Sequence, residues 1–246
     1  MRRIVLSLLA TLLQAPATMA VAAVPQGCPI PTAATIPDRP LGHLASAIRA
    51  GGPVTILAVG SATTKGEDEG SENAFPAHML TALSQALPAV RFELRTRGGK
   101  GTTAAEMLAI IEDELKSRPV PLVVWQTGTV EAVREIRPAE LGAVLDRGTA
   151  AVRQAGADLV LIGPQFSRAL QSRVDLTAYD RVLREAAGRS ETAWFPRAAL
   201  TRKWVELGRI DPERAAKADR ETALETQHSC VGAALAHFIL AGVGLS

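Results

Sequence analysis

Two segments far apart in the chain carry side chains that can cooperate in nucleophilic catalysis. Gly60–Gly66 (GSATTKG) follows an apolar run and contains Ser61, while Glu225–His228 (ETQH) lies near the C-terminus. A carboxylate three residues before a histidine can fix the tautomer and orientation of the imidazole, and such an imidazole can activate a serine hydroxyl. We therefore predict a catalytic set of Ser61, His228 and Glu225.

The elements that must position these residues alternate along the chain. Apolar runs of strand length are each followed by apolar residues at helical spacing. Strands that alternate with helices predict an α/β fold with a parallel sheet covered on both faces. The predicted strands are Val54–Val59, Val90–Leu94, Leu122–Trp125, Leu159–Ile162 and Ala193–Phe195, and the predicted helices are Ala74–Leu87, Ala104–Leu115, Leu141–Ala155, Leu176–Ala187 and Gly232–Leu240.

Small residues follow three of the predicted strands. Ser61 follows the first strand, Gly98–Gly101 the second and Gly128 the third. Because open α/β sheets bind ligands outside the carboxyl ends of their strands, we expect these loops to lie at one cleft. The glycines do not predict a phosphate loop, because no Gly-Lys-Ser/Thr ending is present and the cluster follows the second strand instead of the first. Lys65 and Lys100 either place positive charge near the cleft or are solvated loop residues.

The N-terminus has the features of a secretory signal peptide. Arg2 and Arg3 precede the apolar run Ile4–Leu13, which is too short to span a bilayer, and small residues follow. We predict a signal peptide at 1–23 with cleavage after Ala20 or Ala23, and an uncleaved anchor is the alternative. The protein is therefore predicted to be exported, to the periplasm or beyond, and not to be an integral membrane protein after cleavage.

Composition and charge argue against several partners. The 27 basic residues include Arg2 and Arg3, and without these two they equal the 25 acidic residues. The mature chain is therefore close to neutral, and no basic stripe is available to follow a phosphate backbone. Aromatic residues make up 4% of the chain, which leaves little surface for stacking bases or sugar rings. We expect no nucleic-acid partner.

The chain contains two cysteines, Cys28 and Cys230. In an exported protein such a pair predicts a disulfide, and two unpaired thiols are the alternative. A disulfide here would tie the N-terminal arm to the segment that carries His228. In the chain-entropy model, closing so long a loop stabilises the fold by about 5 kcal/mol.

The remaining residues predict a single domain. We expect an N-terminal arm and first helix at 24–50 and one α/β domain at 51–246. The charged stretch Asp211–Glu225 is predicted to be a solvated helix or loop that leads to a turn at His228. His43, His78 and His237 are interpreted as structural, although His78 lies on the helix after the first loop and could face the cleft.

Four blocks in sequence order resemble the SGNH/GDSL hydrolases. They are Gly60–Gly66, Arg97–Thr102 (RGGKGT), Val123–Thr129 (VVWQTGT) and Glu225–His228, and the resemblance extends over 54–240. It implies a three-layer α/β/α sandwich with a short parallel sheet, similar to flavodoxin. It also implies hydrolysis of esters, thioesters or acetyl groups on lipids and sugars by a serine nucleophile, with neither a metal nor another cofactor.

The family's first block can be aligned with this chain in two registers. Alignment on Gly60, Thr64 and Gly66 puts Ser61 where the family has aspartate and Ala62 where it has the nucleophile. A shift of one residue in the loop makes Ser61 the nucleophile, but Thr64 and Gly66 then no longer align with the family.

The family's oxyanion donors are partly matched. The glycine of the second block matches Gly101, whose backbone amide needs no particular side chain. In the third block Val130 stands where the family has an asparagine donor, and loss of one such donor is worth about 3 to 4 kcal/mol of transition-state stabilisation. Thr129 or Gln126 are candidate replacements. The last block has Glu225 where the family has aspartate.

Two hypotheses follow. The first is an exported serine esterase or acyl hydrolase, acting on a small ester or on an acyl group of an envelope lipid or glycan, with Gly101 and Thr129 at the oxyanion. The second is a catalytically degenerate member of the same fold that binds a ligand or has a structural role in the envelope. An exposed Ala62 with a buried Ser61 would favour the second. The sequence predicts no oligomeric state.

Overall fold

The chain folds around one parallel β-sheet. The computed structural model describes residues 28–31, 36–66, 72–190 and 192–245, so the predicted signal peptide lies outside the described residues. The strands are ordered β2-β1-β3-β4-β5 across the sheet, and every neighbouring pair is parallel. Their bounds are β1 Pro53–Gly60, β2 Arg91–Gly98, β3 Leu122–Gln126, β4 Asp158–Ile162 and β5 Ala193–Phe195.

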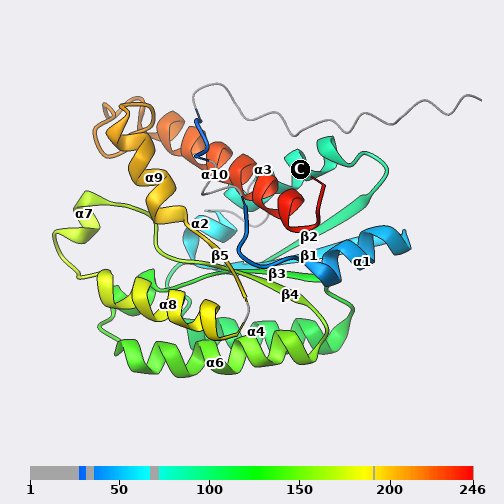
Figure 1. Ribbon diagram of the computed structural model, residues 1–246. Coiled ribbons are helices and arrows are strands. Elements are labelled where there is room, and N and C mark those ends of the chain that lie inside the picture. Colours follow the sequence, from blue (N-terminus) through cyan, green and yellow to red (C-terminus); the bar gives the residue numbers. More distant parts are fainter. Residues whose placement is uncertain (1–27, 32–35, 67–71, 191, 246) are drawn as a thin grey trace, which may run out of the picture.

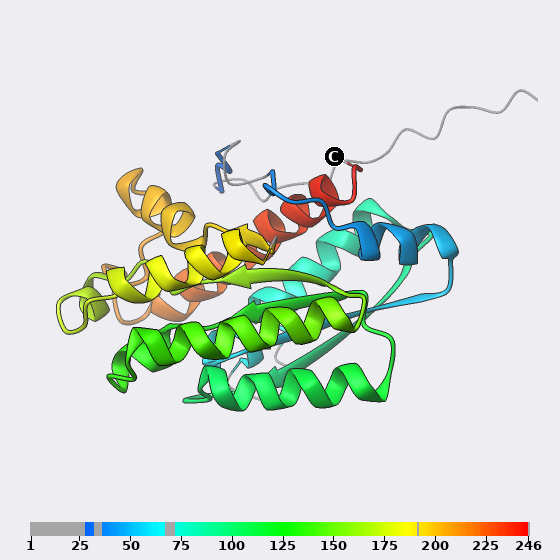
Figure 2. The same ribbon diagram turned by 60° about the horizontal axis from the view of Figure 1, so that its bottom comes forward.

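Helices cover both faces of the sheet, as the sequence predicts (Figures 1 and 2). One layer contains α1 (Gly42–Ala50), α3 (Phe75–Ala86) and α10 (Arg220–Gly242), and the other contains α4 (Ala104–Ser117), α6 (Pro138–Gln154) and α8 (Thr177–Arg189). The remaining helices lie between these elements in the chain; they are α2 (Ala62–Lys65), α5 (Thr129–Val133), α7 (Arg168–Gln171) and α9 (Arg197–Glu206).

Burial explains why the strand pattern was readable from the sequence. All five residues of β3 are buried, and β1 is buried from Ile56 to its end. Strands that are covered on both faces appear as continuous apolar runs. The two helical layers enclose separate clusters of buried apolar side chains, one on each face of the sheet.

The last helix differs from the prediction. Helix α10 begins at Arg220 and not at Gly232, so His228 lies inside a helix and not in a turn before one. The physical reason is that Arg220–Gln227 contains no glycine or proline and several strong helix formers, so the helix extends into the charged stretch. Helix α9 was not predicted either.

The predicted disulfide is present. Cys28 and Cys230 are bonded with their Cα atoms 5.5 Å apart, although 202 positions separate them in sequence. The indole nitrogen of Trp204 donates a hydrogen bond to the carbonyl of Pro29, 2.9 Å away. These two contacts hold the described start of the N-terminal arm against α9 and α10.

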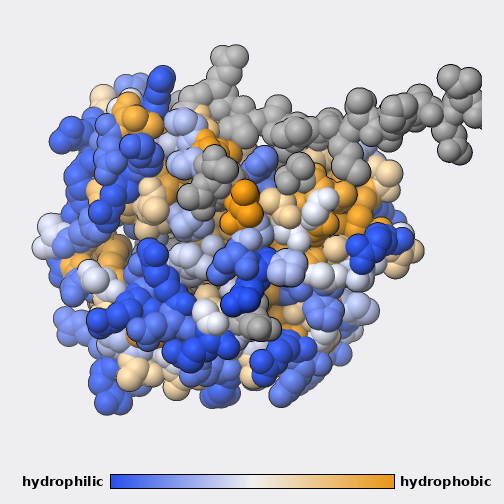
Figure 3. Space-filling view, viewed as in Figure 1, coloured by the Kyte–Doolittle hydropathy of each residue, from blue (hydrophilic) through white to orange (hydrophobic). Residues whose placement is uncertain are grey.

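The surface seen in Figure 3 is largely hydrophilic, with hydrophobic residues in separate groups. The large apolar side chains that are most exposed come from different segments; they are Ile36, Val133, Leu207 and Leu224. Within the described part of the chain, no helix has both the length and the apolar character needed to cross a membrane.

Candidate functional site

The candidate site is built at the carboxyl ends of β1, β2 and β3. Gly60 ends β1 and pairs with Gly98 at the end of β2. A Cβ atom on Gly98 would lie 2.1 Å from the carbonyl oxygen of Gly60, and the φ of Gly98 is +93°. Because both the contact and the backbone angle exclude larger residues, glycine permits the two strands to end this close together.

Gln126, the last residue of β3, organises the loop that follows β1. Its side-chain oxygen Oε1 accepts from the amide of Ser61 at 3.3 Å and from the Ser61 hydroxyl at 3.2 Å. The hydroxyls of Thr63 and Thr64 also reach it, at 3.3 and 3.0 Å. Gln126 is 2% exposed, so this network lies inside the protein. The sequence feature that pointed to Gln126 was its position at the end of an apolar strand.

Ser61 and Ala62 face opposite ways. Ser61 is 9% exposed and its hydroxyl is directed at Gln126, whereas Ala62, the first residue of α2, is exposed. The turn from strand to helix therefore presents a methyl group to solvent and keeps the hydroxyl inside. The register with Ala62 at the nucleophile position and the register with Ser61 there both remain predictions.

His228 lies on α10 and contacts the backbone of Asn73, just before α3. Its Nδ1 atom is 3.0 Å from the carbonyl oxygen of Asn73. Since a carbonyl only accepts, Nδ1 is the donor and Nε2 is left as the basic nitrogen. Burial lowers the pKa of His228, and the positive charge of Arg197 lowers it further. The imidazole is therefore neutral at pH 7.

Glu225 is exposed on α10, and its charge acts on a different histidine. It raises the pKa of His78, which burial otherwise lowers. Among the described residues no hydrogen bond joins Ser61 or Glu225 to His228. The assignment of Ser61, His228 and Glu225 as a catalytic set remains a prediction.

Arg197, at the start of α9, is a buried cation that the sequence analysis missed. It is 1% exposed, and its guanidinium donates to Gln165 Oε1 at 2.8 Å and to Thr63 Oγ1 at 3.3 Å. The guanidinium also lies 5.2 Å from the ring centre of Phe75. Burial lowers the pKa of Arg197 to about 10, so it remains charged at pH 7. No sequence motif marks it.

The predicted oxyanion residues lie in the loops after β2 and β3. Gly101 has a φ of +78°, and its amide has no acceptor among the described residues. Thr129 is the half-buried first residue of α5. Their roles at an oxyanion also remain predictions.

Glu131, two residues after the third block, has a structural role. It is 1% exposed and accepts from the amides of Ala104 and Gly128 at 2.5 and 2.9 Å, and from the hydroxyl of Thr127 at 3.1 Å. The carboxylate therefore joins the N-terminus of α4 to the loop after β3. A negative charge is favourable at a helix N-terminus.

Comparisons with known proteins identify the family. A model of the non-GDSL lipase-like family matches residues 27–245. The chain belongs to this family. This membership confirms the predicted resemblance, with the chain as a divergent relative of the SGNH/GDSL hydrolases. Curated protein sequences gave no significant match.

Several solved structures, one of them of an SGNH-hydrolase family esterase, share the fold of this non-GDSL lipase-like protein. TesA is 22% identical with a TM-score of 0.55, covering 70% of this chain and 94% of its own. AlinE4, an SGNH-hydrolase family esterase, is 21% identical with a TM-score of 0.54, covering 68% and 85%. A catalytic mutant of Axe2, an acetylxylan esterase from Geobacillus stearothermophilus, is 17% identical with a TM-score of 0.60, covering 80% and 96%. At these identities the similarity establishes the fold, and the esterases among the neighbours agree with the predicted enzyme class.

Proposed function

We propose that this non-GDSL lipase-like protein binds an ester or acyl group at the carboxyl edge of its sheet without forming a covalent bond to Ser61. One observation carries the proposal. The hydroxyl of Ser61 is buried on Gln126, while the exposed position of the same loop is Ala62. A nucleophile must reach the carbonyl carbon and hand its proton to a base, and a methyl group can do neither.

Two further features support recognition of a carbonyl or carboxylate at this edge. The amide of Gly101 has no acceptor among the described residues and is available to a ligand oxygen. The charge of Arg197 lies beneath the loop of Thr63 and has no carboxylate partner in the described chain. The predicted export makes an acylated lipid or glycan of the envelope, or a small ester, the ligand class that we expect.

His228 favours a second candidate, a serine esterase. Its Nδ1 is held by the Asn73 carbonyl and its pKa is lowered, so Nε2 is a neutral base. In this candidate Ser61 leaves Gln126, gives its proton to Nε2 and attacks the ester carbonyl. Gly101 and Thr129 stabilise the oxyanion, and His228 passes the proton to the departing alcohol. Water then releases the acyl group by the same steps, and the Asn73 carbonyl holds the imidazole in place throughout.

A fluorophosphonate that traps activated serines distinguishes the two candidates. The chain would be exported to the periplasm so that its disulfide forms, and the adduct would be located by peptide mass spectrometry. Under the binding proposal we expect no adduct on the wild type or on His228→Asn. An adduct on Ser61 that is absent from His228→Asn would overturn the binding proposal and establish the esterase.

Binding itself is tested by nuclear magnetic resonance. ¹⁵N-labelled protein would be titrated with butyrate and with methyl butyrate. We expect concentration-dependent shifts of the Gly101 and Ala62 amides, and a reduced response to butyrate in Arg197→Met. Unchanged amides in the folded wild type with both probes would contradict recognition of short acyl groups at this edge.

A further inference from the structure

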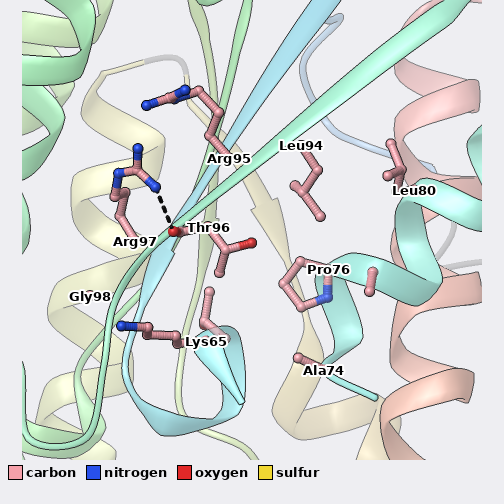
Figure 4. A pocket seen from close by; sticks show the side chains of 11 residues that line it. Lys65, Ala74, Pro76, Leu80, Leu94, Arg95, Thr96, Arg97 and Gly98 are labelled. Carbon is pink, nitrogen blue, oxygen red and sulfur yellow. Dashed lines mark hydrogen bonds between the residues drawn. The ribbon is translucent and has the colours of Figure 1, made fainter. Parts of the chain in front are cut away.

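A pocket of about 720 Å³ lies beside β2 and adjoins the site described above. It is bounded by the C-terminal half of β2, by α2 and by the start of α3 (Figure 4). This volume is in the range of pockets that hold ligands, about 300 to 1,000 Å³. Gln126, His228 and Arg197 do not line it among the described residues, whereas Thr64 of the loop network and Gly98 at the end of β2 do, so the pocket adjoins that network on the β2 side.

The pocket opens on the free edge of the sheet. Strand β2 is the terminal strand and pairs with β1 alone among the described strands. The amide of Gly99 donates to the carbonyl of Gly60, so the backbone groups of the odd-numbered residues of β2 face β1. Because these directions alternate along a strand, we expect the amides and carbonyls of Leu94 and Thr96 to face away from β1, and the Thr96 carbonyl already accepts one hydrogen bond, from Arg97 Nη1.

The two sides of the pocket differ in chemistry. Figure 4 shows Leu94, Leu80 and Pro76 on one side of β2 and Arg95 and Arg97 on the other. The first group belongs to the layer of α3, and the two arginines lean toward α4. This division follows from the alternation of side chains along a strand.

The arginine side carries excess positive charge. Arg95 and Arg97 share one carboxylate, Glu114, at distances of 2.8 and 2.6 Å. Arg97 also donates from Nη1 to the carbonyl of Thr96 at 3.1 Å. The two arginine side chains remain 28% and 38% exposed, so a ligand in the pocket can reach the guanidinium nitrogens that are not bonded to Glu114.

We propose that the open edge of β2 binds an extended peptide segment in which acidic and apolar residues alternate. Such a segment would pair its backbone with Leu94 and Thr96, as peptides do when they add a strand to an exposed edge. Its acidic side chains would face Arg95 and Arg97, and its apolar side chains would face Leu80, Leu94 and Pro76. The period of two in a strand matches the two-sided pocket, and this function is additional to ester or acyl binding.

The probe is a fluorescein-labelled heptapeptide, acetylated and amidated at its ends, in which valine and glutamate alternate. Fluorescence anisotropy with the disulfide-bonded protein measures its affinity. We expect the same peptide with lysine in place of glutamate to bind at least about tenfold more weakly, because its charges oppose those of the arginines. N-methylation of every second backbone amide blocks one edge of the peptide. Of the two such peptides, one should lose binding and the other retain it.

Hydrogen exchange locates the contact on the protein. Peptide binding should slow exchange of the Leu94 and Thr96 amides. Arg97→Gln leaves Arg95 to pair with Glu114 and should weaken binding about threefold to tenfold, whereas Arg147→Gln on the exposed surface of α6 is the matched control and should leave binding unchanged. Thermal unfolding of both variants verifies that they remain folded.

Four results would overturn the proposal. The first is equal affinity for the glutamate and lysine peptides, and the second is binding without protection of Leu94 and Thr96. The third is a dimer of the protein, detected by sedimentation without peptide, that protects the same two amides, because the edge would then belong to a second copy of the chain. Absence of any binding by the glutamate peptide to the folded protein would also count against it.

Discussion

The side-chain oxygen of Gln126 lies 3.2 Å from the hydroxyl oxygen of Ser61, where β3 ends beside the end of β1. The same oxygen faces three other donors, from the amide of Ser61 and the hydroxyls of Thr63 and Thr64. An amide oxygen has two lone pairs, so these four donors share one acceptor. The conformation of the whole loop after β1 therefore depends on this side chain.

Removal of the Gln126 side chain should destabilise the protein. Gln126→Ala leaves the buried donors of Ser61 and Thr64 without an acceptor, and we expect a loss of about 2 to 4 kcal/mol in the free energy of unfolding. Urea denaturation followed by circular dichroism measures it. Gln154→Ala, at the exposed end of α6, is the control and should cost less than about 0.5 kcal/mol. Equal effects of the two substitutions would show that the Gln126 network does not hold the loop.

Glu225→Gln should change the titration of His78 more than that of His228. The charge of Glu225 raises the pKa of His78, whereas the charges that act on His228 are those of Arg197 and His78. Loss of the carboxylate should therefore lower the pKa of His78. The imidazole resonances of the two histidines, followed by nuclear magnetic resonance against pH, measure both values. A larger shift at His228 would restore the predicted pairing of Glu225 with His228.

Stability should decrease as the solution becomes acidic. Burial lowers the pKa values of His78 and His228 below the ordinary value of 6.5. The unfolded chain then binds more protons than the folded chain once the pH falls below about 6.5, so the contribution of these histidines is complete above that pH and is lost below it. Urea denaturation at pH values from 8 to 5 tests the sign.

A matched variant separates the histidines from other titrating groups. His228→Asn removes one of the two groups and should make the loss of stability between pH 6.5 and 5 smaller. A pH profile that is as steep in His228→Asn as in the wild type would mean that His228 does not carry the dependence.

Loss of the disulfide should destabilise the protein strongly. The bond between Cys28 and Cys230 closes a loop across 202 positions. We expect its removal to lower the free energy of unfolding by about 2 to 5 kcal/mol. Urea denaturation with and without dithiothreitol measures the effect, and a Cys28→Ser/Cys230→Ser double variant should not respond to the reductant. Identical curves for the oxidised and reduced wild type would refute the expectation.

The sequence was sufficient to predict the layers of the fold. Each predicted strand overlaps an observed one, because strands buried on both faces must be apolar throughout and parallel strands need helices between them. The blocks of the family resemblance and the cysteine pair were also readable, since they are local patterns or a simple count. The start of α10 was not, because the residues from Arg220 to Gln227 are charged or polar and mostly exposed, so no apolar periodicity marks where the helix begins.

The candidate site depended on contacts that sequence patterns do not contain. The order of the motifs indicated which residues meet at the sheet edge, and the choice between Ser61 and Ala62 was open. The tertiary structure decided which of the two faces inward, because the direction of a side chain in a loop depends on an acceptor, Gln126, that lies 65 positions away. It likewise placed Arg197 beside Thr63 across 134 positions. Burial and charge at such long-range contacts arise from the packed fold, whereas periodicity and motif spacing are properties of the chain itself.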